Sequence, residues 1–95
     1  MSDSRLQFEW DPSKAERNAR KHGVHFAEAL TVFQDRRHQL SYDHKHFAEE
    51  DRYKVIGISG FGRVLAVCIA DEEGVVRIIS ARKATRHERN EYEGH

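Results

Sequence analysis

The middle of the chain carries three strand-like segments that follow one another with short connections containing glycine. Residues 53–59 and 63–70 are rich in β-branched and apolar side chains, and a Gly-Phe-Gly connection at 60–62 separates them. A polar connection at 71–74 ends in glycine and leads to a third segment at 75–81. Connections of this kind are typical of β-hairpins. We therefore expect an antiparallel sheet with one apolar face that needs a cover.

Two helices are predicted before these strands. The Asp-Pro pair at 11–12 is typical of a helix start, since the aspartate can accept from exposed N–H groups and proline fits the first turn. This helix is expected to span residue 12 to residue 21 or 22, with Gly23 left-handed beyond its end. After His25, apolar residues between 26 and 33 recur at i, i+3, i+4 and i+7. That spacing predicts an amphipathic second helix, which can cover the sheet.

The ends of the chain complete an α+β pattern. Apolar and polar residues alternate between positions 6 and 10, which predicts a half-buried strand, and residues 39–42 fit another short strand. Thr85 with Glu88 three residues later matches a capping box and predicts a helix over 86–93. The expected order is β-α-α-β-β-β-β-α, with the helices packed on one antiparallel sheet.

Length and composition limit the class of protein. A chain of 95 residues, 38% of them hydrophobic, is expected to form one domain (1–95) with a modest core. Its formal net charge of zero argues against a general nucleic-acid coat protein, although it permits a local basic patch. The single cysteine, Cys68, cannot form an internal disulfide. Because the sequence shows no signal-peptide pattern and no membrane-length apolar run, we expect a cytoplasmic protein.

The local basic patch is expected where the last strand passes into the last helix. Residues 75–92 carry five lysines and arginines against two acids. Such a segment can hold several guanidinium groups beside a phosphate backbone. Arg77 and Arg82 would point to opposite faces of a regular strand, so a bend near residues 80–81 is needed to bring them together. The five cations are Arg77, Arg82, Lys83, Arg86 and Arg89.

Four segments in order, from about Phe8 to Glu93, resemble the BrnT toxins of bacterial type II toxin–antitoxin systems. They are FEWDPSKAERNARKHGV, FAEALTVF, EEDRYKVIGIS and RIISARKATRHERNEYE. The resemblance implies a RelE-like fold, an antiparallel sheet with two N-terminal helices packed on it and a short C-terminal helix. It also implies a ribonuclease that inhibits translation. A ribbon–helix–helix antitoxin, BrnA, would neutralise it, and the toxin would meet operator DNA only through that antitoxin. His25 departs from the family, which often has Ser or Thr there.

RNA cleavage without a metal or another cofactor needs three tasks. The 2′-hydroxyl loses a proton, the phosphoryl oxygens gain stabilising contacts, and the leaving 5′-oxygen is protonated. Arginine suits the second task, because its planar fork pairs with two oxygens and stays charged. RelE-like enzymes use sets of Arg, Lys, Tyr, Glu and His, so the resemblance implies a similar set here. The expected catalytic residues are Arg82 first, then Arg52, Lys83, Tyr92 and Glu50.

Further residues are expected to bind RNA around that set. Arg77 lies near Arg82 in the chain, and the first helix carries a basic face with a histidine at its end. That face could position RNA, meet the antitoxin or simply be solvated. Tyr92 has two interpretations as well: it acts as an acid or stacks on a base, or its ring anchors the last helix to the sheet. The first-helix candidates are Lys14, Arg17, Lys21 and His22.

The segment 43–49 contains zinc- and manganese-ligand types that suggest a competing site. Asp43, His44, His46 and Glu49 crowd together there, with His38 upstream. Their spacing matches no rigid metal motif, so no metal site is predicted.

Two hypotheses from different functional classes stay open. The first is a metal-independent endoribonuclease toxin that holds RNA across the sheet with Arg52, Arg77, Arg82 and Lys83. It depends on Arg52 and Arg82 converging on one phosphate-sized spot. The second is a non-catalytic module whose basic strand–helix segment binds an acidic partner or nucleic acid. A metal nuclease built on segment 43–49 is a third possibility.

Overall fold

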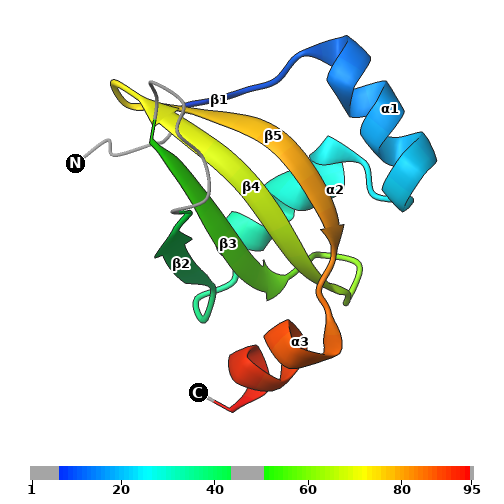
Figure 1. Cartoon of the computed structure of the whole chain (residues 1–95), viewed down its shortest axis with the longest axis vertical. Helices are drawn as coiled ribbons and strands as arrows, with labels where there is room; N and C mark the ends of the chain where they lie inside the picture. Colours follow the sequence, from blue (N-terminus) through cyan, green and yellow to red (C-terminus); the bar gives the residue numbers. More distant parts are fainter. Residues whose placement is uncertain (1–6, 44–50, 95) are drawn as a thin grey trace.

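The computed structural model describes residues 7–43 and 51–94, in which one five-stranded sheet is surrounded by short helices (Figure 1). The order of elements predicted from the sequence is confirmed. No helix in these two stretches is long and apolar enough to cross a membrane. In chain order the elements are β1 (Gln7–Glu9), α1 (Pro12–His22), α2 (Phe26–Thr31), the 3-10 turn η1 (Val32–Gln34), β2 (Gln39–Tyr42), β3 (Arg52–Ile58), β4 (Val64–Glu72), β5 (Val75–Lys83) and α3 (Arg86–Glu93).

The helix ends follow the predicted capping chemistry. Asp11 accepts a hydrogen bond from the Ser13 N–H at 3.0 Å, and Gly23 adopts φ 71° beyond the end of α1. At α3 the Thr85 hydroxyl accepts from the Glu88 N–H while the Glu88 carboxylate accepts from the Thr85 N–H. Both helices therefore begin at residues that the sequence marks.

The sheet is mixed and mostly antiparallel, in the order β1-β5-β4-β3-β2. Strands β2 to β5 pair antiparallel, and the short connections predict this for β3 to β5. Strand β1 instead runs parallel to β5, with its three residues beside Val75–Arg77. The chain travels through α1 and α2 before it re-enters the sheet, so no tight turn fixes the direction of β1. This parallel edge is a feature that the sequence analysis did not anticipate.

Strand β5 contains a β-bulge. Cys68 of β4 lies opposite Ser80, whereas the next residue, Ile69, lies opposite Ile78. Ile79 is therefore the extra residue of β5, and it shifts the alternation of side chains between faces by one position. This bulge supplies the irregularity that the sequence analysis required near residues 80–81.

The bulge places Arg77 and Arg82 on the same face of the sheet although they are five residues apart. Val76 and Ile78 before it, and Ala81 after it, are buried on the opposite face. Without the extra residue, Arg82 would lie on the face opposite to Arg77, which is the core face. One irregular position thus sorts the side chains of β5 into a core side and a cationic side.

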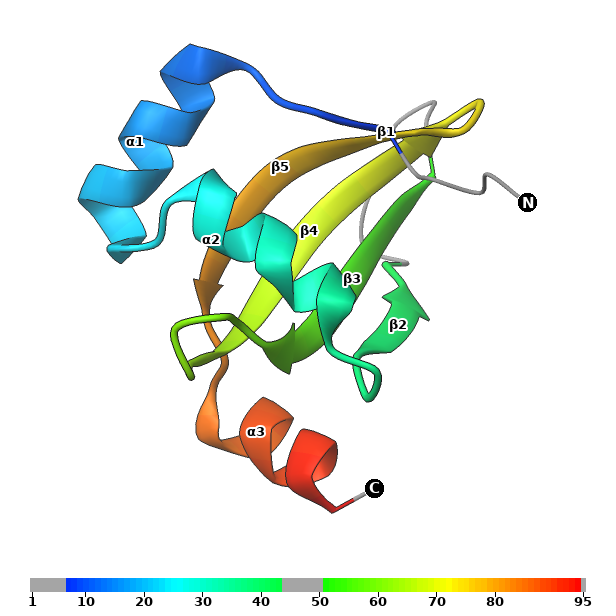
Figure 2. The same ribbon diagram turned by 180° about the vertical axis from the view of Figure 1, so that it is seen from behind.

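The core lies between the sheet and α2, which crosses in front of β5 and β4 in the view of Figure 2. The ring centroids of Phe8 and Phe33 are 5.0 Å apart, and Trp10 meets Phe26 edge-on at 5.9 Å. These aromatic contacts close the core beside β1. The most deeply buried apolar residues of this core are Val24, Phe26, Ala29, Val32, Val55, Leu65, Val67, Ile78 and Ala81.

The opposite side of β3–β5 is here called the open face; among the described residues, α3 covers it at one end (Figure 1). Tyr92 packs there against Ile56 and Ala66, and its hydroxyl donates to Asp35 at 2.5 Å. The Ile58 N–H donates to the same carboxylate oxygen at 2.9 Å. Asp35, the residue that follows η1, thereby joins α3 to the end of β3.

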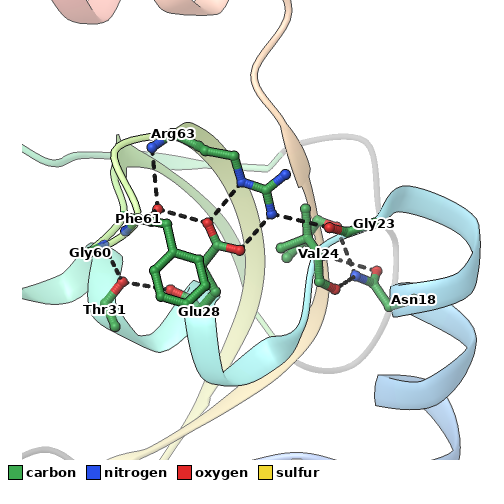
Figure 3. Close-up of polar contacts among 10 residues, drawn as sticks. Asn18, Gly23, Val24, Glu28, Thr31, Gly60, Phe61 and Arg63 are labelled. Atoms are coloured by element: carbon green, nitrogen blue, oxygen red, sulfur yellow. Dashed lines mark hydrogen bonds and ion pairs between the residues drawn. The ribbon is translucent and has the colours of Figure 1, made fainter.

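A buried carboxylate fixes α2 to the β3–β4 connection (Figure 3). The Glu28 side chain is 2% exposed and accepts from the Arg63 guanidinium through both oxygens, at 2.5 and 3.0 Å. It also accepts from the Ser59 hydroxyl at 2.7 Å. The hydrogen bonds from Arg63 outweigh the opposing effect of burial, so the pKa of Glu28 lies below its usual value.

Removing Arg63 would leave Glu28 buried without its charged partner. We expect Arg63→Ala to lower the free energy of unfolding by about 3 kcal/mol, the low end for breaking a buried pair, because Arg63 itself is partly exposed. Urea unfolding followed by Trp10 fluorescence measures this. Arg89→Ala, an exposed arginine of α3, is the control and should change little. Equal stability of the two variants would contradict a structural role for the pair.

Candidate functional site

Four cationic side chains share the open face of the sheet. Arg52 and Arg77 lie in one row across the sheet, because both pair with Ala70 of β4. Lys54 and Arg82 lie in the next rows toward α3 on the same strands, β3 and β5. Residues paired across antiparallel strands point to the same face, so all four side chains leave the sheet on the side away from α2.

The register places Arg52 and Arg82 on the same face of the sheet, in different rows. Arg82 shares a row with Ile56, four residues along β3 from Arg52. At ~3.3 Å per residue the two rows are roughly 13 Å apart along the strands. The cation that shares a carboxylate with Arg82 is Lys54, which the sequence analysis did not select.

Glu88 of α3 brings Lys54 and Arg82 together. Nη1 and Nη2 of Arg82 donate to Oε1 and Oε2 of Glu88 at 2.8 and 3.0 Å. Nζ of Lys54 donates to Oε2 at 2.9 Å. The capping box at Thr85 orients the carboxylate at the same time. One side chain of α3 therefore fixes two cations from two strands.

The charges of this cluster are strongly coupled. The Arg82 guanidinium, then the Thr85 N–H and Lys54, hold the pKa of Glu88 far below its usual range despite the opposing effect of burial. The hydrogen bonds with Glu88 raise the pKa of Arg82. Glu88 is 9% exposed, whereas Lys54 and Arg82 are 41% and 39% exposed. The carboxylate is hidden and both cations can still contact a ligand.

A hollow of about 190 Å³ lies beside the two cations on the open face. Its volume equals that of roughly six waters, so it admits a phosphate group. Small side chains on β4 and β5 leave this space open, and the side chains of Lys54 and Arg82 line its wall. The lining residues are Asp43, Lys54, Ala66, Val67, Cys68, Ser80 and Arg82.

Lys83 and Tyr92, two of the expected catalytic residues, do not line this hollow. Lys83 pairs with Leu65, whose side chain is fully buried on the helix-covered face, so Lys83 belongs to the other side of β5. Tyr92 is buried, and both burial and its bond to Asp35 raise the pKa of its hydroxyl. That placement fits the anchoring interpretation of its ring. Glu50 lies outside the described residues.

The basic side of α1 flanks the open face. Asn18 faces β5, with its side chain bonded to the backbone of that strand. On a helix, Lys14, Arg17 and Lys21 lie to one side of Asn18, opposite the alanines that pack toward α2 and the core. All three are exposed, whereas His22 at the helix end is half-buried. The three exposed cations therefore extend the positive charge of the open face beyond β5.

The competing metal site receives no support from the described residues. Among residues 7–43 and 51–94 no group of three His, Cys, Asp or Glu side chains could hold a metal ion. His38 contacts the Asp35 carbonyl oxygen through Nδ1 at 2.8 Å. The other proposed ligands, His44, His46 and Glu49, lie outside the described residues.

Two site residues missed by the sequence analysis carried readable signals. Lys54 is two residues from Arg52, and the period of a strand puts both on one face. Glu88 was interpreted only as part of a capping box, although its position six residues after Arg82 also allows an ion pair. No local pattern points to a partner for Asn18, because its contact with Ala81 spans 63 residues.

Comparison with known proteins identifies a family. A sequence model described as "Ribonuclease toxin, BrnT, of type II toxin-antitoxin system" matches residues 10–88. The crystal structure of the Brucella abortus ribonuclease toxin, BrnT, superimposes with a TM-score of 0.61 at 22% identity, covering 86% of this chain and 100% of that one. The comparison with curated proteins gives no match. The superposition agrees with the α+β fold described above.

The ion pairs of Glu88 should make stability depend on acid pH. Its folded-state pKa lies below the ordinary 4.5, so the unfolded chain takes up this proton first as pH falls. The stabilisation of the folded state by the Glu88 ion pairs is complete above pH 4.5 and is lost progressively as the pH falls below this value. We expect the unfolding free energy of Glu88→Gln to fall less steeply than that of the wild type between about pH 5 and pH 3.

Chemical unfolding at a series of pH values measures this difference. Glu28 and Asp35, whose pKa values are also lowered, are present in both proteins, so the difference reports Glu88. Glu93→Gln, an exposed position on the same helix, should follow the wild-type curve. Parallel curves for wild type and Glu88→Gln would contradict the coupling described here.

Proposed function

Since the chain belongs to the BrnT family of ribonuclease toxins from type II toxin–antitoxin systems, we propose that it cleaves RNA at the open face without a metal ion. The observation that carries this proposal is the pair of accessible cations, Lys54 and Arg82, fixed by Glu88 at the wall of a phosphate-sized hollow. The cleavage of messenger RNA in the cytoplasm would inhibit translation.

The reaction that fits these groups is attack of the RNA 2′-hydroxyl on the adjacent phosphorus. A bond forms between O2′ and phosphorus, and the bond from phosphorus to O5′ breaks. The leaving O5′ takes a proton from solvent water, which leaves a cyclic phosphate and a 5′-hydroxyl. Negative charge grows on the phosphoryl oxygens during this step. Arg82 and Lys54 are the groups that stabilise it, because fixed cations need no reorganisation when the charge develops.

Glu88 has a positioning role in this proposal. Both oxygens of Glu88 already accept hydrogen bonds from Arg82, Lys54 and the Thr85 N–H, so the carboxylate is not in position to take the proton of a hydroxyl. Its two oxygens instead orient one edge of Arg82 and the ammonium of Lys54. Asp43 also lines the hollow, and the proposal assigns the 2′-hydroxyl proton to its carboxylate.

The remaining cations are proposed to hold RNA on either side of the hollow. Arg52 and Arg77 lie at one end of the open face, and the exposed side of α1 lies beyond β5. Phosphate contacts of this kind give affinity with little sequence preference. Arg77 keeps a long ion pair with Glu72, with 4.0 Å between Nη2 and Oε2, which leaves its guanidinium able to exchange partners.

The second candidate function is a non-catalytic binding module. The position of Tyr92 favours it, because a buried tyrosine already bonded to Asp35 gives the open face no phenol to protonate a leaving oxygen. In that case the same cations would bind RNA or an acidic protein without cleavage.

Arg82→Ala separates these functions. We expect RNA cleavage by the wild type to persist in the presence of a chelator and to fall at least ~100-fold in Arg82→Ala, as for loss of one charge-stabilising donor. Gel analysis of a defined messenger RNA measures the rate, and Arg89→Ala is the matched control. Tight binding with intact RNA would support the binding module. Loss of cleavage upon chelation would support a metal nuclease instead.

A BrnA-like antitoxin is proposed to neutralise the toxin by covering the open face. Occluding the cations is the simplest way to stop RNA from reaching them, and an acidic surface would complement them. We expect the double variant Arg52→Ala/Arg82→Ala to bind the cognate antitoxin at least ~10-fold more weakly, roughly 1.4 kcal/mol. Calorimetric titration measures this affinity. Unchanged affinity would place the antitoxin elsewhere.

A further inference from the structure

In the part of the chain that the structure describes, most of the outer edge of β5 has no neighbouring strand. Strand β1 pairs with β5 only at Val75–Arg77, so the backbone groups of β5 that point outward beyond this stretch need other partners. At Ala81 a side chain takes the place of a strand. Oδ1 of Asn18 accepts from the Ala81 N–H at 3.1 Å, and Nδ2 of Asn18 donates to the Ala81 carbonyl oxygen at 2.8 Å.

Asn18 is fully engaged at this position. Its side chain also donates to the Val24 carbonyl oxygen at 2.9 Å, which ties α1, the turn after it and β5 together (Figure 3). The residue is 7% exposed, so water competes little for these bonds. A buried amide with all of these partners is a precise geometric constraint on the backbone of β5.

The constrained position lies between the bulge and the proposed catalytic arginine. Ile79 is the extra residue, Ala81 follows two positions later, and Arg82 is next. A shift of β5 by one residue would send Arg82 toward the core and Lys83 onto the open face. Strand β4 fixes β5 from one edge only, and Asn18 fixes it from the other.

We propose that Asn18 is a positioning residue for Arg82. By holding both backbone groups of Ala81, it keeps the residues after the bulge in the register that presents Arg82 to Glu88 and to the hollow. It also fixes the basic side of α1 at a constant distance from that arginine. The effect on cleavage rests on the proposed ribonuclease function, whereas the effect on the placement of Arg82 does not.

Asn18→Leu tests the proposal, because leucine has a similar size and makes none of the three hydrogen bonds. The Nη–H signal of Arg82 in a proton–nitrogen NMR spectrum reports whether Glu88 holds the guanidinium, because Nη1 and Nη2 are the atoms that donate to it. We expect this signal to move toward the position of an unconstrained arginine in Asn18→Leu. Ser59→Ala, which removes a buried hydrogen bond to Glu28 far from Arg82, is the matched control and should leave it unchanged.

Cleavage gives a second readout that a purely structural role would not move. We expect kcat of Asn18→Leu to fall about 100-fold with KM nearly constant, the effect of a small misplacement of a catalytic group. In the Arg82→Ala background the same substitution should add little, because its effect passes through Arg82. Ser59→Ala should keep the wild-type kcat at temperatures where it is folded.

The outcomes separate the two claims. An unchanged Arg82 signal in folded Asn18→Leu overturns the positioning role, even if cleavage by the wild type upholds the proposed function. A wild type that cleaves no RNA overturns the proposed function, and the Arg82 signal still decides the role of Asn18. If Asn18→Leu does not fold, Asn18→Asp keeps the acceptor for the Ala81 N–H and loses the donors. It should then show an intermediate shift, and a wild-type signal in it overturns the role.

Discussion

The cationic face depends on how the side chains of strand β5 alternate between the two faces of the sheet. A regular strand would divide Arg77 and Arg82 between the two faces, one of them in the core. The bulge at Ile79 avoids this by inserting one residue, so apolar side chains before and after it stay under α2. The basic segment can then follow the strand directly without placing a guanidinium in the core. Burial and charge are satisfied by the same irregularity.

Glu88 extends this arrangement from the sheet to α3. The same carboxylate caps the first turn of the helix and binds Arg82 and Lys54. Burying a carboxylate is unfavourable unless charged and hydrogen-bonded partners compensate, and here four donors do so. The Glu88 side chain consequently both attaches α3 to the sheet and positions the two cations. Tyr92 then secures the other end of the helix through Asp35.

The sequence predicted the order and bounds of the elements well, because those signals are local. The Asp-Pro start of α1, Gly23 beyond its end and the Thr85–Glu88 box each act within a few residues. The register of β5 and the direction of β1 depend on pairing between distant segments, so local patterns did not reveal them. For the candidate site, Arg82 was the first choice from the sequence, and it does line the hollow. Lys54 was overlooked, and Lys83, also selected, lies on the other side of the strand because the pairing with Leu65 decides its face.

The floor of the hollow is built from Ala66, Cys68 and Ser80, whose side chains point away from the main core. A larger side chain at Cys68 or Ser80 would fill the hollow without crowding the residues under α2, whereas one at Ala66 would also press against Tyr92. Under the proposed function, folding and activity would then be governed by different sides of the same strands. A single substitution at Cys68 or Ser80 would abolish cleavage while the fold persists, and such a harmless copy could be inherited.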